Sequence, residues 1–209
     1  MSRRIQEKFN SSADSTDDPW TPLVIKARDG SKDAFTELVG LFHDDIFKMV
    51  FYRTRTQMDA EDITQEIFMQ VFRKLSGLKK VERFKSWLFS IAINRVRDFN
   101  RKKRFRALFK MSNGSDEIKT AKPEIHHNPE PINELMRQDF WKQIGLLLNK
   151  LPNMEREVFL LRFMDHLSIK EISIALKKSE STVKTHLYRS LIKFRKNETI
   201  LPTLKKETT

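Results

Sequence analysis

Residues 168–194 decide the fold, and they read SIKEISIALKKSESTVKTHLYRSLIKF. Ser168 and Glu171 have the spacing of a capping box, in which the serine hydroxyl accepts from the glutamate amide and the carboxylate accepts from the serine amide. Such a box marks the start of a helix, and the pattern predicts that this helix ends near Lys177. A second helix follows at once, with Ser179 as its predicted N-cap.

The second helix is predicted to be amphipathic. Val183, Leu187 and Phe194 share one side. Two short helices joined by a tight turn are typical of a helix-turn-helix, whose second helix enters the DNA major groove. Hydroxyl and basic side chains on the outer side suit bases and phosphates, although a core helix with a merely solvated polar side is the alternative. The predicted DNA-binding residues are Ser181, Thr182, Lys184, Thr185, His186 and Arg189.

Helical periodicity divides the 209 residues into two blocks. The segment between the blocks contains three prolines and an Asn-Gly-Ser run, which are typical of a linker. The sequence therefore predicts an all-α protein of two small helical domains joined by a flexible linker, the second domain being a helix-turn-helix. The predicted boundaries are a disordered tail over 1–24, a first domain over 25–105, a linker over 106–133, a second domain over 134–197 and a tail over 198–209.

The charge balance indicates a polyanionic partner. Lys and Arg outnumber Asp and Glu by 40 to 28, for a net charge of +12. Nucleic acid is favoured over a membrane, because no run approaches the roughly 20 apolar residues of a spanning helix. No apolar segment follows the N-terminal arginines, so we expect a cytoplasmic protein without membrane insertion.

An acidic helix stands out in this basic chain. Asp59 is its predicted N-cap, and an acidic face would repel DNA and suit a basic protein surface. The alternative is that acids at the helix start complement the helix dipole, which explains Asp59 and Glu61 well. The residues predicted to bind a protein are Asp62, Gln65, Glu66 and Met69.

A basic run with nearby aromatic residues ends the first block. Cations at this density suit a phosphate backbone, and neighbouring aromatic rings suit unpaired bases. The alternative is that the aromatic residues belong to the core, which we favour for Phe99. The predicted residues of this second DNA surface are Trp87, Asn94, Arg97, Arg101 and Lys102.

Signals of an enzyme are weak. The chain has no cysteine, and its five histidines lack the spacing of a zinc site. We expect no catalytic residues, no metal and no cofactor.

The chain resembles the extracytoplasmic-function (ECF) sigma factors of bacterial RNA polymerase. Three stretches of the first block and two of the second are similar to family motifs: Asp33–Leu38, Asp59–Phe68, Phe84–Asp98, Leu151–Arg162 and Ser179–Leu187. The family often has Gly where this chain has Lys177 and Ser181, and Arg where it has His186.

The resemblance implies a role for each surface. The acidic helix would dock on the clamp of core RNA polymerase. The basic surface would bind the partly single-stranded −10 promoter element, with residues 76–83 capturing a flipped base. The helix-turn-helix would bind the −35 duplex, and an anti-sigma factor of unknown identity would regulate the protein.

Two other functions stay open from the residues alone. A helix-turn-helix regulator that does not dock on polymerase would account for residues 152–195 but leave two helices unexplained, the acidic one and the one similar to the −10-binding part of the family. A nucleic-acid enzyme with a DNA-binding appendage would need clustered carboxylates or metal ligands.

Overall fold

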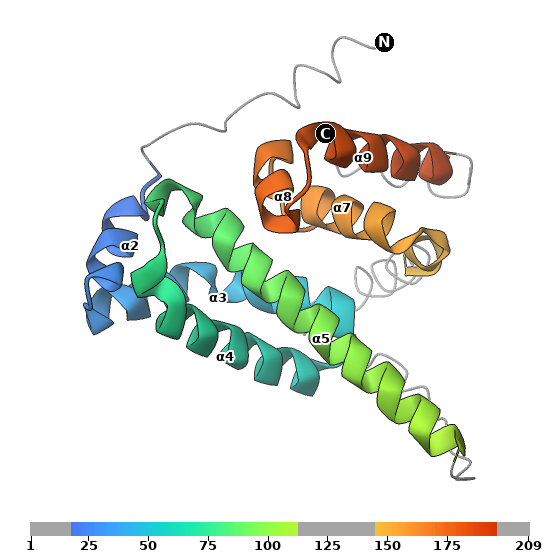
Figure 1. Ribbon diagram of the computed structural model, residues 1–209, viewed down its shortest axis with the longest axis horizontal. Helices are drawn as coiled ribbons and strands as arrows, with labels where there is room; N and C mark the ends of the chain where they lie inside the picture. Colours follow the sequence, from blue (N-terminus) through green and yellow to red (C-terminus); the bar gives the residue numbers. More distant parts are fainter. Residues whose placement is uncertain (1–17, 113–144, 196–209) are drawn as a thin grey trace, which may run out of the picture. The chain divides into compact units, whose positions relative to one another are not determined.

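The structure is a computed structural model that describes residues 18–112 and 145–195. Both ranges are helical and contain no strand, which confirms the predicted all-α class. The chain forms two compact units, the first holding α2 to α5 and the second holding residues 145–150, α7, most of α8 and α9 (Figure 1). No helix of the described ranges is long and apolar enough to cross a membrane.

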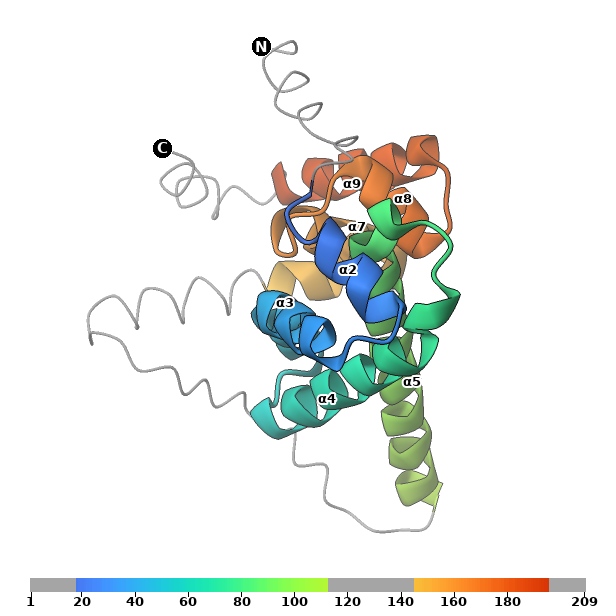
Figure 2. The same ribbon diagram turned by 90° about the vertical axis from the view of Figure 1, so that its left-hand side faces the viewer.

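The first unit is built on three long helices. They are α3 (Lys32–Thr54), α4 (Gln57–Lys74) and α5 (Phe84–Ser112). The short α2 (Thr21–Arg28) packs on α3, and the 3-10 turns η1 (Leu75–Gly77) and η2 (Val81–Arg83) connect α4 to α5 (Figure 2). The side chains buried at their centre are large and apolar, such as Leu38, Ile46, Ile67, Leu88 and Phe89.

The two long helices that follow α2 begin with side-chain caps. The Ser31 hydroxyl accepts from the Ala34 amide at 3.2 Å, and the Thr56 hydroxyl accepts from the Asp59 amide at 3.3 Å. The prediction that Asp59 is the N-cap of α4 is therefore wrong: Asp59 is the third helical residue, and its amide is the group being capped.

Both predicted ends of the first domain need correction. α2 begins at Thr21, inside the range expected to be a disordered tail, and its Val24 is fully buried. Trp20 joins this helix to the core through ring contacts with Phe42 at 5.8 Å and Phe84 at 5.9 Å. A helix of eight residues has too few turns for a clear apolar period, which is why the pattern missed it.

At the other end, α5 continues to Ser112, past the predicted boundary at 105. Residues 99–112 contain no proline or glycine to stop the helix. The rest of the predicted linker, and most of both predicted tails, lie outside the described residues.

The second unit has an aromatic centre. α7 (Asn153–Phe163) packs on α9 (Glu180–Arg195), and the rings of Phe159 and Phe194 stack with centroids 4.3 Å apart. Beside them the buried Glu155 carboxylate accepts from Lys193 Nζ at 2.7 Å. The Arg156 guanidinium donates to three carbonyl oxygens at the end of the preceding helix, those of Leu148, Asn149 and Leu151.

The predicted capping box is confirmed at α8 (Ile169–Leu176). The Ser168 amide donates to the Glu171 carboxylate at 2.7 Å, and the Glu171 amide donates to the Ser168 hydroxyl at 3.2 Å. Lys177 makes the turn to α9 with a φ of 54°, in the left-handed region that favours glycine. Lys177 thus holds a conformation that glycine adopts more easily than lysine does.

Candidate nucleic-acid interface and docking groove

The side of α9 away from the core carries the polar residues expected to bind DNA. Val183, Leu187 and Phe194 are buried, so the opposite side is free of packing within the unit. The exposed residues on it are Ser181, Lys184, Thr185, Tyr188 and Arg189, with Thr182 half-buried. Tyr188 is 66% exposed and was missing from the predicted set, although its place between Thr185 and Arg189 puts it on the same side.

Three hydroxyl groups gather at the start of α9. The Ser179 hydroxyl accepts from the Thr182 amide at 3.2 Å and lies 2.9 Å from the Ser181 hydroxyl and 2.8 Å from the Thr182 hydroxyl. A helix N-terminus carries partial positive charge from its free amides. Hydroxyls held there suit the oxygen of a phosphate group.

His186 differs from its neighbours on α9. It is half-buried, and its Nδ1 atom is fully buried without a hydrogen-bond partner in the structure. The ring is therefore partly turned away from the exposed side formed by Lys184, Thr185 and Arg189. The spacing of residues along a helix cannot show this, because position 186 lies at the border between the two sides.

The outer side of α5 carries the second basic surface. Trp87, Asn94 and Arg101 are seven residues apart and so share one side of the helix. Asn94, Arg97, Arg101 and Lys102 are exposed, whereas Trp87 is half-buried, with its ring 6.1 Å from that of Phe84. Arg101 also pairs with Asp98 at 3.1 Å, a contact too exposed to hold it firmly.

The acidic residues of α4 divide into two groups. Glu66 forms an ion pair with Arg95 of α5, and Asp59 lies 3.7 Å from Lys103 of the same helix. These two acids therefore help to hold α4 against α5. Asp62 and Gln65 are exposed, and they remain available to a partner.

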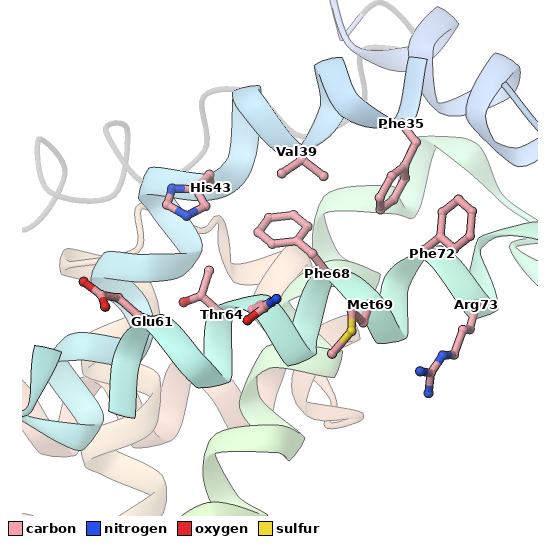
Figure 3. Close-up of a pocket in the computed structure, with 10 residues that line it drawn as sticks. Phe35, Val39, His43, Glu61, Thr64, Phe68, Met69, Phe72 and Arg73 are labelled. Atoms are coloured by element: carbon pink, nitrogen blue, oxygen red, sulfur yellow. The ribbon is translucent and has the colours of Figure 1, made fainter. Parts of the chain in front are cut away.

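A groove between α3 and α4 adjoins these residues, and sequence reasoning missed it (Figure 3). Two ring contacts cross it, one between Phe35 and Phe72 at 5.0 Å and one between His43 and Phe68 at 6.3 Å. Its cavity volume is about 540 Å³. The apolar lining residues are Phe35, Val39, Phe68, Met69 and Phe72.

The groove has features of a docking surface. Met69 is 45% exposed and Phe72 is 53% exposed. The Thr64 hydroxyl is buried in it without a hydrogen-bond partner in the structure. An unsatisfied buried hydroxyl costs stability, so a partner that bonds to it would gain free energy on binding.

One signal in the sequence points to this groove. α4 has two apolar rows, Ile63–Ile67–Val71 and Thr64–Phe68–Phe72, each spaced by four residues. The first row is buried throughout, whereas the second ends in the exposed Phe72. When the apolar side of a helix is wider than the area that neighbouring helices cover, the uncovered part can bind a partner.

The side chains that the structure describes form surfaces rather than a metal site. Within residues 18–112 and 145–195, no three His, Asp or Glu side chains are placed to hold a metal ion. The exposed groups described above are hydroxyls, cations, carboxylates and apolar side chains, which are groups suited to contacts with DNA or protein.

The family comparisons match both units. The family described as Sigma-70 region 2 matches residues 38–106, and the family described as Sigma-70, region 4 matches residues 141–194. Among solved structures, CnrH in complex with the cytosolic domain of CnrY has a TM-score of 0.61 at 21% identity, covering 84% of this chain and 94% of that one. The sigma factor RpoE from Bartonella quintana, solved with the anti-sigma factor NepR, has a TM-score of 0.59 at 22% identity, covering 79% and 96%. These structures share the fold.

Curated relatives extend the match along the chain. It is 29% identical over 180 residues to the ECF RNA polymerase sigma factor BldN of Streptomyces coelicolor, covering 86% of this chain and 66% of BldN. It is 28% identical over 174 residues to the ECF sigma factor SigW of Bacillus subtilis, covering 83% and 93%. A "Probable RNA polymerase sigma factor" of Haemophilus influenzae is 33% identical over 140 residues, covering 63% and 72%. The chain belongs to the extracytoplasmic-function sigma factors of RNA polymerase.

Proposed function

We propose that this protein carries core RNA polymerase to promoter DNA through three surfaces. The exposed side of α4 and the adjoining groove dock on the polymerase. The outer side of α5 binds the −10 element and favours its opened form. The exposed side of α9 binds the −35 duplex in the major groove.

The groove between α3 and α4 is the observation that carries the proposal. A helix-turn-helix regulator that works without polymerase docking has no use for it. Glu61 and Gln65 line it, and Asp62 is the exposed residue next to Glu61 on α4, so one partner surface can combine apolar contact with bonds to acidic and amide groups. A basic helix of the polymerase with apolar side chains fits this combination.

The two DNA surfaces are supported by their side chains. On α9, Arg189 suits a bidentate contact with guanine, and Lys184 suits a phosphate group. On α5, Asn94, Arg97 and Arg101 form an exposed row that suits the backbone and bases of the −10 element. Opening of the DNA follows from tighter binding to the unpaired strand than to the duplex, so the protein itself performs no covalent step.

We propose that residues 113–133 link the two units and allow them to reach separate promoter elements. This segment contains three prolines and no long apolar run. Trypsin should therefore cut the free protein there and leave two resistant fragments. A single resistant fragment spanning both units would contradict the linker.

An anti-sigma factor is a further proposed partner. The solved structure of RpoE from Bartonella quintana holds such a factor, and CnrH was solved with the cytosolic domain of CnrY. The apolar groove gives such a factor a place to compete with polymerase. Because polymerase and promoter DNA are in the cytoplasm, we propose that the protein acts there.

Core polymerase binding tests the proposal. The test variant combines Asp62→Lys with Met69→Glu. The first change places a cation opposite an expected basic group of the partner, and the second places an anion against an expected apolar one. We expect at least about a tenfold loss in affinity for core polymerase of the source bacterium, because two contacts at the centre of an interface typically cost more than 1 kcal/mol each.

The matched control is Glu37→Lys, which makes the same kind of charge reversal at an exposed acid of α3 that does not line the groove. Glu66 is left intact in both variants, because its loss would break the ion pair with Arg95. Equal affinities of the two variants for polymerase would contradict docking through α4.

A further inference from the structure

The last turns of α5 carry large apolar side chains on the surface. Phe105 and Leu108 are each 67% exposed, and Phe109 is 60% exposed. The rings of Phe105 and Phe109 lie 6.1 Å apart in a tilted arrangement, so they form one aromatic surface. In Figure 1 this part of α5 extends beyond α3 and α4.

These side chains lie on the side of α5 that faces away from the first unit. Lys103 shows which side faces α4. Its Nζ atom lies 3.7 Å from the Asp59 carboxylate of α4 and 5.6 Å from the ring centre of Phe99. Residue 105 is rotated by about 160° from residue 103, since successive residues differ by about 100° around a helix. Phe105 therefore cannot enter the core that α4 and α5 share.

Cations surround the aromatic surface. Arg101, Lys102 and Arg106 line a shallow depression together with Phe105. Residues 99–112 contain six lysines or arginines and no acid. The patch is thus both aromatic and strongly positive. The centre of an ordinary protein–protein interface, by contrast, contains few charged residues.

Single-stranded nucleic acid is the ligand that matches both properties. Its phosphates suit the cations, and its unpaired bases offer flat faces for stacking. In duplex DNA the bases already stack on one another, so they offer no free face to the phenylalanine rings. A membrane surface favours a helix with apolar and basic residues on separate sides, whereas here Phe105 lines the same depression as three cations.

The position of the patch supports this choice. Phe105 lies four residues after Arg101 and eleven after Asn94, on the same side of α5, so the aromatic patch continues the exposed row proposed to bind the −10 element. From Arg101 to Phe109 the helix rises about 12 Å, which is long enough to follow several nucleotides. A strand that is opened along the row would pass directly onto the aromatic surface.

We propose that Phe105 and Phe109 stack on unpaired bases of the opened promoter, with Arg101, Lys102 and Arg106 holding the phosphates. The proposal rests on the sigma-factor function stated above and adds a second single-strand contact beyond the −10 row. Its role is to stabilise the open promoter after the polymerase has docked.

The test uses holoenzyme assembled from core polymerase and the full chain. The first measurement is the affinity of each variant for core polymerase, so that failure of docking is seen separately. The second is its affinity for one promoter in two forms, a fully paired duplex and the same duplex with an unpaired bubble at and downstream of the −10 element. The variants are Phe105→Ala with Phe109→Ala, Phe105→Leu with Phe109→Leu, Phe105→Tyr with Phe109→Tyr, and Leu108→Ala as the matched control.

We expect the double alanine variant to bind the bubble at least about fivefold more weakly and the paired duplex unchanged, since each stacked base contributes a loss of this size or more. The leucine pair should lose as much, the tyrosine pair should restore binding, and Leu108→Ala should resemble the wild type. Full binding of the bubble by the alanine or leucine pair would overturn the proposal. So would a loss confined to core polymerase affinity.

Discussion

α5 and α9 are the two helices proposed to bind DNA, and they are packed in different ways. One side of α9 is buried as far as Phe194, the residue before the last of the helix. Among its exposed residues, only Tyr188 and Ile192 are large hydrophobics. α5 is buried only as far as Val96, and its last turns expose Phe105 and Leu108. α9 thus has buried residues almost to its end, whereas residues 101–109 of α5 are all exposed.

This difference matches two forms of DNA. A duplex groove is read by rigidly held polar groups, and α9 holds its hydroxyls through the Ser179 cap. An unpaired strand is bound by stacking and charge, which suit the exposed aromatic and basic residues in the last turns of α5. The packing of each helix therefore supports the DNA state that we propose for it, and the following variants test that contrast in order of expected effect.

The largest effect is expected on stability. Leu187→Ala in α9 removes a side chain that is only 5% exposed, whereas Leu108→Ala in α5 removes one that is 67% exposed. The first change should lower the free energy of unfolding of the second unit by about 2–5 kcal/mol. The second should stay within about 0.5 kcal/mol. Thermal unfolding followed by circular dichroism gives both values, and similar losses would show that the end of α5 is packed after all.

Promoter discrimination should change next. Arg189→Ala removes a side chain suited to guanine, so holoenzyme should lose about 1–3 kcal/mol of preference for its −35 sequence over a scrambled one. Lys184→Ala should weaken binding to both sequences and reduce the salt dependence of binding, because a phosphate contact carries no sequence information. If Arg189→Ala discriminates as well as the wild type, α9 reads DNA through another side.

A smaller gain in stability is expected at the turn between α8 and α9. Lys177→Gly should stabilise the second unit by about 1 kcal/mol, because a side chain at a φ of 54° costs about this much. Lys178→Gly is the matched control, since Lys178 is not among the described residues with a positive φ. A rise in the unfolding temperature for both variants, or for neither, would remove the turn as a source of strain.

The smallest effect is expected at the ion pair between α4 and α5. Arg95→Ala should lower the stability of the first unit by about 0.5–1 kcal/mol, because both partners keep contact with water, with Arg95 27% and Glu66 41% exposed. Core polymerase affinity should remain near the wild-type value. A loss as large as that of the Asp62 and Met69 variant would mean that Glu66 and Arg95 belong to the docking surface.

The sequence predicted what local chemistry determines. The capping box at Ser168 and the cap at Ser179 depend on residues within three positions of each other, and both form as expected. The apolar period of α9 likewise predicted the burial of Val183, Leu187 and Phe194, although it gave no sign that Ser190 is buried beside them. Glycine was absent at Lys177, yet the turn keeps a left-handed conformation, since the helices on both sides fix the backbone there.

Contacts between distant elements were not predictable in this way. The pairing of Glu66 with Arg95 joins residues 29 positions apart, and the groove between α3 and α4 depends on how two helices cross. Periodicity assigns a residue to a side of its own helix but does not show what covers that side. Trp87 and His186 were placed on binding sides by spacing, and the structure half-buries both.

Selection of DNA from a randomised library tests the central claim most directly. The library is incubated with core polymerase and the full chain, with the chain alone and with core alone, and the retained DNA is sequenced. We predict two separate blocks of preferred sequence, one for each DNA surface, and only when chain and core are both present. A single preferred block that the chain retains equally well without polymerase would contradict the account and leave a simple helix-turn-helix regulator.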